Sequence, residues 1–391
     1  MNEERRGINM KKILAVAHSY YMLLTLIQMK MKVYKNDMMD LLLSDASSNN
    51  QTIFHNLKKS GIFNSCYFYH LSDVGWKTSD RKKEKAKKFF NGILKPQNII
   101  SKAGIKTGKY DILLIYVAGR FDEQVIFNVI KKKNPKAVCE LYEEGYTSYF
   151  NMYGVFASYP KMYIKILPII MFLTGKKRFL TSNNINRAWY FNPGLVQYNA
   201  DFDICKIPAF DIKDKELIYK INTIYGYSNN CDVKQDVIFL EGKSFTDGLP
   251  TDDLELLNRL CRNIGKENIV VKLHPRTRVN RFISEGYQMF EADIPLELVI
   301  LNGKGTGKVF IAMESGAPLT CLMDFQNDNN VVLLFKCSKF VDGQTADRHF
   351  LKLLDMLKKK SGNGQLAIPE TISELDKISK KINCKLKNNK K

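Results

Sequence analysis

Three short motifs carry side chains that could transfer protons and hold a charged leaving group. They are Glu143-Glu-Gly145, His274-Pro275 and Glu314-Ser-Gly316. A carboxylate can remove a proton from an attacking hydroxyl group when burial or a neighbouring carboxylate raises its pKa. A histidine can donate a hydrogen bond or a proton to a departing phosphate. Together these residue types fit the transfer of a glycosyl group from a nucleotide-activated donor to a hydroxyl acceptor.

More than one carboxylate in the sequence could act as the general base that removes the acceptor proton. We predict Glu144, with Glu143 in reserve, because an adjacent pair of carboxylates can separate its two pKa values. Asp247, in Thr246-Asp-Gly248, is a further candidate because it is expected to follow a strand. A tight turn explains that last motif equally well.

The second half of the chain offers groups for the phosphate side of the reaction. His274 is the predicted partner of the leaving group, and a serine hydroxyl with neighbouring backbone N–H groups can hold phosphate oxygens. Lys272 alternates with apolar residues, so a solvent-facing position is its alternative. The predicted donor-binding set is Lys272, Pro275, Arg276, Glu314, Ser315 and Gly316.

The elements that must position these motifs alternate between strand and helix in both halves of the chain. In the first half we predict strands at 13–17, 66–71, 111–117 and 137–142, and helices at 18–27, 76–90 and 122–131. In the second half we predict strands at 237–240, 269–273, 309–313 and 331–335, and helices at 252–264 and 348–360. Such alternation is typical of parallel βαβ units. The predicted fold class is α/β, with two Rossmann-like doubly wound domains facing each other across a cleft.

Each of the three motifs comes directly after a predicted strand. In open α/β sheets the carboxyl ends of the strands are where ligands bind, so we expect the motifs to line the cleft. The predicted boundaries are an N-terminal acceptor-side domain at 1–200, a connecting region at 201–235 and a nucleotide-sugar domain at 236–362. A C-terminal helix and basic tail would occupy 363–391.

The composition indicates a globular protein with an anionic partner. The chain has 391 residues, 45% of them hydrophobic, and 60 basic against 40 acidic residues give a formal charge of +20. An anionic donor and an anionic membrane surface both suit this charge. A basic nucleic-acid-binding protein is the alternative class, but no helix-turn-helix, zinc-finger or RNA-recognition motif is visible, so we expect no nucleic-acid partner. The sequence leaves a homodimer open.

No metal site or membrane span is expected. The eight cysteines form no Cys-x-x-Cys pair, and Asp201-Phe-Asp203 lies in the connecting region rather than after a strand. The longest apolar segment, at 164–174, is too short for a bilayer and contains Lys165 and Pro168. An interfacial patch beside Lys176-Lys-Arg178 is its alternative. With no signal peptide visible, we expect a cytoplasmic protein, with a peripheral position at the inner face of the plasma membrane left open.

The order of the motifs resembles a known family. A strand followed by Glu-Glu-Gly, then Lys-x-His-Pro-Arg, then a strand followed by x-Ser-Gly, resembles the bacterial sialyltransferases of glycosyltransferase family 52, which act on lipooligosaccharide and capsule. The chain is also similar to polysialyltransferases in its acidic and His-Pro motifs. The resemblance extends from the first strand to Phe335, and the His-Pro element with its basic flanks is its most specific part.

The resemblance implies a GT-B architecture, CMP-sialic acid as donor, a surface glycan as acceptor, inversion at the anomeric carbon and no metal. By position it assigns Glu144 to the acidic motif, His274 and Pro275 to the His-Pro motif, and Ser315 to the phosphate-binding hydroxyl. The chain departs from the family in two places. The family's acidic motif more often carries aspartate, and its phosphate motif often has paired hydroxyl residues where this chain has Glu314-Ser315. A GT-B transferase with another nucleotide-activated donor remains the alternative.

Overall fold

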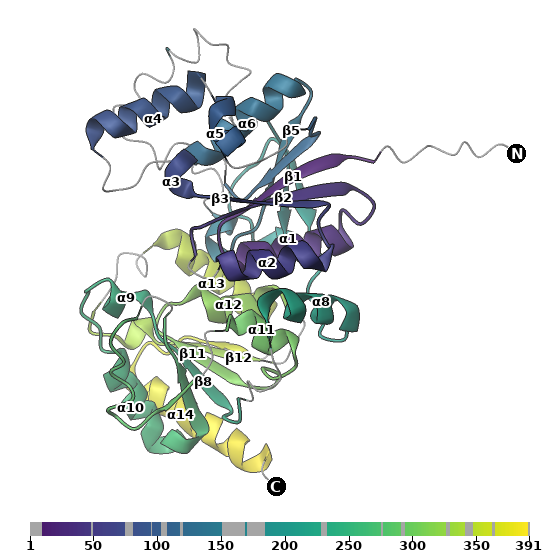
Figure 1. Cartoon of the computed structure of the whole chain (residues 1–391). Helices are drawn as coiled ribbons and strands as arrows, with labels where there is room; N and C mark the ends of the chain where they lie inside the picture. The colour runs from purple at the N-terminus through teal and green to yellow at the C-terminus, as the bar shows by residue number, and fades with distance from the viewer. Residues whose placement is uncertain are drawn as a thin grey trace, which may run out of the picture. The chain divides into compact units, whose positions relative to one another are not determined.

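The chain folds into two compact units. The computed structural model describes residues 10–47, 50–74, 81–94, 96–102, 108–117, 120–150, 169, 184–227, 233–274, 277–290, 294–325, 329–340, 347–361 and 364–389 (Figure 1). Unit 1 comprises Met1–Pro208 and Tyr219–Gly226, and unit 2 comprises Ala209–Ile218 and Tyr227–Lys391. The chain therefore passes from one unit to the other three times.

Unit 1 is built on a seven-stranded sheet in the order β3-β2-β1-β4-β5-β6-β7. Each adjacent pair is parallel. The order reverses between β1 and β4, which is the topological switch point where open α/β sheets bind ligands. The strands are β1 Lys12–Ala17, β2 Met38–Ser44, β3 Ser65–Tyr69, β4 Ile112–Ile115, β5 Val138–Tyr142, β6 Ile185–Tyr190 and β7 Asp203–Lys206.

Helices cover both faces of this sheet, with α1 and α2 on one side and α3, α5 and α6 on the other (Figure 1). Ser19 begins α1 by accepting the Met22 N–H at 3.2 Å, which satisfies one of the unpaired donors of the first turn. Carboxylates begin α6 and three lysines end it, so both ends complement the helix dipole. The helices are α1 Tyr20–Lys32, α2 Asn50–Ser60, α3 Leu71–Val74, α4 Lys82–Leu94, α5 Pro96–Lys102, α6 Phe121–Lys133 and α8 Lys215–Tyr225, which extends from unit 2 into unit 1.

Unit 2 contains a six-stranded parallel sheet in the order β10-β9-β8-β11-β12-β13, with its switch point between β8 and β11. The strands are β8 Val237–Leu240, β9 Ile269–Lys272, β10 Gln288–Met289, β11 Val309–Ala312, β12 Asn330–Leu333 and β13 Leu366–Ala367. The helices are α9 Lys243–Thr246, α10 Asp253–Ile264, α11 Leu296–Leu301, α12 Gly316–Met323, α13 Arg348–Lys360 and α14 Ile372–Asn389.

The C-terminal helix is an integral part of unit 2. Helix α14 packs on α10, and Arg259 donates two hydrogen bonds to Asp376 at 2.8 and 2.6 Å. Asn263 adds a hydrogen bond to Ser379 at 2.7 Å. Leu375 of α14 is fully buried in the core of unit 2, so the helix within 363–391 is packed into the unit.

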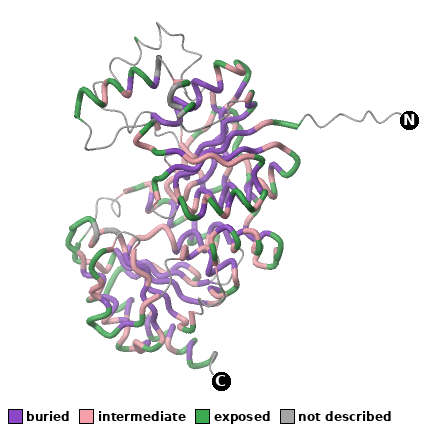
Figure 2. Tube along the Cα trace, viewed as in Figure 1, coloured by how far each residue is buried: buried purple, intermediate pink, exposed green. Residues whose placement is uncertain are grey.

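The predicted fold class is confirmed: both units are Rossmann-like, doubly wound and parallel. The central strands are buried while helix faces reach the surface (Figure 2), and the edge strand β7 is largely exposed. Strands β2, β6, β7, β10 and β13 were not predicted, and β7 and α8 lie in the region expected to connect the domains. Apart from residue 169, the apolar segment 164–174 lies outside the described residues. Within the described chain, no helix has the length and apolar character needed to cross a bilayer.

Candidate functional site

In unit 2, His274 and Glu314 project from the same edge of the sheet. Leu240 of β8 aligns with Lys272 of β9 on one side and with Ala312 of β11 on the other. Each of the two residues comes two positions after this aligned row, so they share the carboxyl edge. Since one strand separates β9 from β11, their backbones are roughly 10 Å apart.

A pocket of about 410 Å³ opens at the switch point of unit 2, a size typical of small-ligand sites. Ser244, which follows β8, donates a hydrogen bond to Glu314 Oε1 at 3.1 Å and so joins the two sides of the switch point. Asp252 fixes another wall by accepting the Lys339 backbone N–H at 2.8 Å. The pocket is lined by Ser244, Leu249, Pro250, Thr251, Met313, Glu314, Phe335, Ser338, Lys339 and Phe340.

Ser315 begins α12. Its hydroxyl oxygen accepts the Ala317 N–H at 3.3 Å, which leaves the hydroxyl hydrogen able to donate to another acceptor. The Gly316 N–H belongs to the first helical turn, where backbone donors lack partners within the helix. The predicted phosphate-binding hydroxyl therefore adjoins Glu314 at the pocket wall.

Glu241 positions the backbone of the histidine motif. It follows β8, is 3% exposed, and accepts the His274 backbone N–H at 3.0 Å and the Thr277 hydroxyl. Arg281 donates to Glu241 Oε1 at 3.4 Å and to Asp253 Oδ2 at 2.5 Å. The turn after β9 is thus tied to a buried ionic network. Pro275 and Arg276 lie outside the described residues.

Of the predicted residues of unit 2 that the structure describes, Glu314 lines this pocket, whereas His274, Ser315, Gly316, Lys272 and Asp247 are not among its lining residues. Lys272 is half-buried, with its Nζ 4.9 Å from the centre of the Phe290 ring. Asp247 follows the short helix α9, and its side chain is exposed. Asp247 follows β8 as expected, but the short helix α9 lies between them.

In unit 1 the switch point is occupied by aromatic and ionisable side chains that the sequence interpretation did not assign. His18 follows β1, Tyr116 follows β4, and their ring centres lie 5.7 Å apart, edge to face. His18 Nδ1 is 2.9 Å from Ser44 Oγ, and its Nε2 is 3.7 Å from Asp122 Oδ2 and 3.5 Å from Glu123 Oε1. His18 therefore meets the carboxylates that begin α6.

The charges in this cluster are unequal. Burial lowers the pKa of His18 to about 3, so the imidazole is neutral at physiological pH. Burial raises the pKa of Glu123 well above its usual range. Burial alone would raise the pKa of Asp122, but the charge of Arg120 keeps that pKa low. Arg120 Nε donates a hydrogen bond to Asp122 Oδ1 at 3.0 Å. Among the described residues, His18 Nε2 and both Glu123 carboxyl oxygens have no hydrogen-bond partner.

Glu144 lies beside this cluster after β5. Its side chain is only partly exposed, and burial raises its pKa to about 7 against the opposing charge of Arg120. Its backbone N–H donates to Ser148 Oγ at 3.0 Å, which fixes the turn. Gly145 has φ 131° and ψ −170°, a conformation that is essentially restricted to glycine. The turn thus holds a carboxyl group that can take up or release a proton near neutrality.

Glu143 has a different environment from its neighbour. It is fully buried and accepts the Tyr149 hydroxyl at 2.7 Å and the Phe191 backbone N–H at 2.8 Å. These bonds connect β5 to the turn that follows it and to the end of β6. Glu143 therefore positions the loop that carries Glu144.

Within each unit the structure groups the predicted residues at the carboxyl edge of the sheet. Unit 1 has Glu143, Glu144 and Gly145, and unit 2 has His274, Glu314, Ser315 and Gly316. The same strand-end signal that singled out His274 applies to His18 and Glu241. Asp122 and Glu123 had been read only as a helix start. No group of three or more His, Cys, Asp or Glu side chains in the described ranges is arranged to hold a metal ion.

No family model matches this chain, and no curated protein matches its sequence. LpCGTa in complex with UDP has a TM-score of 0.49 and 10% identity, covering 96% of this chain and 90% of its own. The calicheamicin glycosyltransferase CalG4 scores 0.47 at 9% identity, covering 97% and 90%. UDP-N-acetylglucosamine 2-epimerase from Rickettsia bellii scores 0.44 at 14% identity, covering 95% of both chains. Likenesses this distant assign no activity.

Proposed function

We propose that this protein is a GT-B glycosyltransferase that uses a nucleotide-activated sugar, and that its donor is CMP-sialic acid. The observation that carries the proposal is Glu144, a carboxyl group with a pKa of about 7 at the carboxyl edge of a doubly wound sheet. Such a group is matched to removing a proton from a sugar hydroxyl at neutral pH. The pocket at the switch point of unit 2 supports the proposal, because nucleotides commonly bind at this position in doubly wound sheets.

In the proposed reaction, unit 2 binds the donor. The Ser315 hydroxyl and the Gly316 N–H donate hydrogen bonds to phosphate oxygens, and Glu314 accepts hydrogen bonds from ribose hydroxyls. His274 donates to the phosphate as the bond between the anomeric carbon and the phosphate oxygen breaks. CMP leaves with the electron pair of that bond and its negative charge.

Unit 1 activates the acceptor in this scheme. Glu144 takes the proton of the acceptor hydroxyl while the oxygen forms its bond to the anomeric carbon on the face opposite CMP, so the configuration inverts. No step requires a metal ion, and turnover is therefore expected to persist in EDTA. A loss of activity in EDTA that added Mg²⁺ restores would contradict that part of the proposal.

His18 is the competing base, and the geometry argues against it. Its Nε2 faces Asp122 and Glu123 inside the unit, and the residue is only 4% exposed. With a pKa of about 3, His18 accepts a proton far less readily than Glu144. Glu143 is engaged by Tyr149 and Phe191, which suits a positioning role. We therefore assign the proton transfer to Glu144.

The test is release of nucleotide from a panel of donors. Purified protein is incubated with CMP-sialic acid, UDP-glucose, UDP-N-acetylglucosamine or GDP-mannose, with galactose-terminated and sialic-acid-terminated acceptors, and free nucleotide is measured. The proposal expects CMP release that depends on acceptor and falls sharply in Glu144→Gln. Nucleotide release from another donor alone would contradict sialic acid as the transferred sugar. Absence of nucleotide release from every donor would contradict glycosyl transfer itself.

A further inference from the structure

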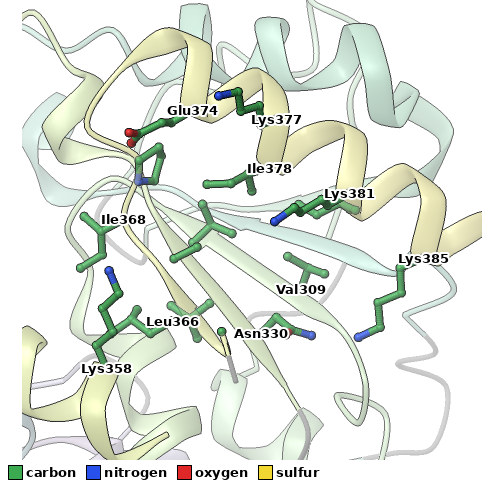
Figure 3. A pocket seen from close by; sticks show the side chains of 16 residues that line it. Val309, Asn330, Lys358, Leu366, Ile368, Glu374, Lys377, Ile378, Lys381 and Lys385 are labelled. Atoms are coloured by element: carbon green, nitrogen blue, oxygen red, sulfur yellow. The ribbon is translucent and has the colours of Figure 1, made fainter. Parts of the chain in front are cut away.

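Unit 2 contains a second concave site, on a part of the sheet that the proposed chemistry does not use. It is a groove of about 560 Å³ that runs over β11, β12 and β13 between α13 and α14 (Figure 3). Val309 and Asn330, which line it, are the first residues of β11 and β12. The groove therefore reaches the amino edge of the sheet, whereas Glu314 follows the carboxyl end of β11. It shares no lining residue with the pocket at the switch point.

The floor of the groove is apolar and its rim is basic. Strand and loop residues meet α14 side chains along the floor, and no aromatic side chain is among the lining residues that the structure describes. The apolar members of the lining are Val309, Val331, Val332, Leu366, Ala367, Ile368, Pro369, Ile378 and Ile382. The charged members are Lys358, Lys377, Lys381, Lys385 and Glu374.

The lysines lie on both sides of the groove. Figure 3 shows Lys377, Lys381 and Lys385 along α14, with Lys358 across from them. The α14 lysines are spaced by four residues, so they share one face of the helix. In the described part of the chain, these three ammonium groups make no hydrogen bond or salt bridge. The row of positive charge is thus available to a ligand.

An apolar floor beside a cationic rim selects a ligand that has both characters. A hydrocarbon chain gains free energy by leaving water for the floor, and an anionic head group gains by meeting the lysines. Single-stranded nucleic acid is a weaker match, because such sites stack bases on aromatic side chains. The volume lies within the range of small-molecule sites, which suits one chain of an amphiphile.

We propose that this groove binds an anionic lipid, with an acyl chain on the floor and the head group on Lys377, Lys381 and Lys385. The site would hold unit 2 at an anionic membrane surface while leaving the pocket at the carboxyl edge of the sheet open to soluble donor. This inference is independent of the glycosyl transfer proposed above, since it uses none of the same residues.

The first experiment separates chain from head group. The full-length protein is titrated calorimetrically with dodecyl phosphate, dodecyl maltoside and inorganic phosphate. Its co-sedimentation is also measured with phosphatidylcholine vesicles that contain or lack phosphatidylglycerol. The proposal expects saturable binding of dodecyl phosphate, much weaker binding of the other two ligands, and co-sedimentation only with anionic vesicles. Equal binding of inorganic phosphate, or equal co-sedimentation with neutral vesicles, would overturn it.

The second experiment uses matched charge variants on one helix. Lys381→Gln with Lys385→Gln removes two rim charges, whereas Lys380→Gln with Lys387→Gln removes two α14 charges that do not line the groove. At about fivefold per lysine, the rim pair should weaken binding to anionic vesicles roughly 25-fold. The control pair should change it much less. If both pairs of substitutions weakened vesicle binding equally, the vesicles would be binding a diffuse basic surface, and the proposed lipid site in the groove would be wrong.

A third variant tests whether the apolar floor binds the hydrocarbon chain, and thermal unfolding checks that the variant is folded. Ile378→Ser places a hydroxyl on the apolar floor and should weaken dodecyl phosphate at least tenfold. Unchanged affinity in a folded variant would contradict the chain site. An oligothymidine that displaces dodecyl phosphate from the wild-type protein more strongly than anionic vesicles do would assign the groove to nucleic acid instead.

Discussion

The carboxylate of Glu241 accepts the backbone N–H of His274 at 3.0 Å, so a residue after one strand sets the position of a residue after its neighbour. Glu241 is buried and pairs with the partly buried Arg281, which also pairs with Asp253. Removing one member of such a network leaves charge and hydrogen-bonding groups uncompensated in the interior. The histidine turn thus depends on a side chain that touches no substrate.

Glu241→Ala is expected to lower the unfolding free energy by about 3 kcal/mol, because Arg281 and the His274 N–H both lose a buried acceptor. Glu241→Gln keeps an oxygen for the N–H and should cost less. In the Ala variant, turnover is expected to fall more than donor affinity, because His274 would be displaced while the pocket walls remain. Denaturant unfolding and steady-state kinetics measure both. Wild-type stability in the Ala variant would refute the network's role.

Glu144→Gln should lower kcat by roughly 10²- to 10⁴-fold, the usual contribution of a general base. In the wild-type protein the rate should rise with pH through about 7, because only the ionised carboxylate accepts the proton. This inflection should be absent from the variant's residual activity. A pH–rate profile of both proteins checks the assignment, and an unchanged kcat at pH 8 would exclude it.

The same substitution should stabilise the protein. The folded pKa of Glu144 lies above its ordinary 4.5, so the folded state binds more protons than the unfolded state between pH 4.5 and 7. Wild-type stability therefore falls as pH rises through that window, by about 3 kcal/mol in total from this group. Glu144→Gln should be more stable by that amount at pH 8 and nearly equal at pH 4.5. Urea unfolding at the two pH values tests this.

His18 should act in the opposite direction. Its folded pKa of about 3 lies below the ordinary 6.5, so its contribution is fully present above pH 6.5 and is lost as pH falls toward 3. At pH 7, His18→Asn should cost about 1 to 2 kcal/mol through the contact with Ser44. At pH 4 the variant should match or exceed the wild type, because the unfolded wild-type chain protonates His18 while the buried imidazole of the folded state stays mostly neutral. A constant difference across pH would contradict this account.

Ser315 has two separable roles. Ser315→Ala removes the cap of α12 and should cost about 1 kcal/mol of stability, and it also removes the phosphate-binding hydroxyl. Ser315→Asp retains a cap but places a negative charge where phosphate is proposed to bind. The Asp variant should therefore unfold like the wild type yet raise the KM for CMP-sialic acid at least as much as the Ala variant. Lower KM in the Asp variant would refute the phosphate contact.

The sequence predicted the central strands well because their residues are buried on both faces. β4, β8 and β11 are uninterrupted runs of apolar side chains, as a covered parallel strand requires, and β5 and β9 each contain one charged residue among apolar ones. Strand β6 escaped prediction because its polar residues are satisfied inside the sheet layer. Arg187 lies 3.8 Å from Glu140, and Trp189 donates to Glu140 at 2.6 Å. Such pairings depend on the adjacent strand and are invisible in a local pattern.

The residues of the candidate site were predictable only where a polar motif directly follows an apolar strand. His274 and Glu144 stood out for this reason, whereas Asp122 and Glu123 resembled an ordinary charged helix start. Their importance comes from β1, which brings His18 to Nε2 distances of 3.7 and 3.5 Å from them. The pKa of Glu144 likewise depends on burial by surrounding elements, which its own segment does not encode.

The interleaved course of the chain affects how the two units can fold and be separated. Residues 219–226 belong to unit 1, where Tyr225 donates to the Tyr20 carbonyl at 2.7 Å and Asn56 donates to the Ile224 carbonyl at 3.2 Å. Unit 1 therefore cannot complete its core on the ribosome until Gly226 has emerged, well after its last strand. Any single proteolytic cut therefore leaves a segment of one unit attached to the other.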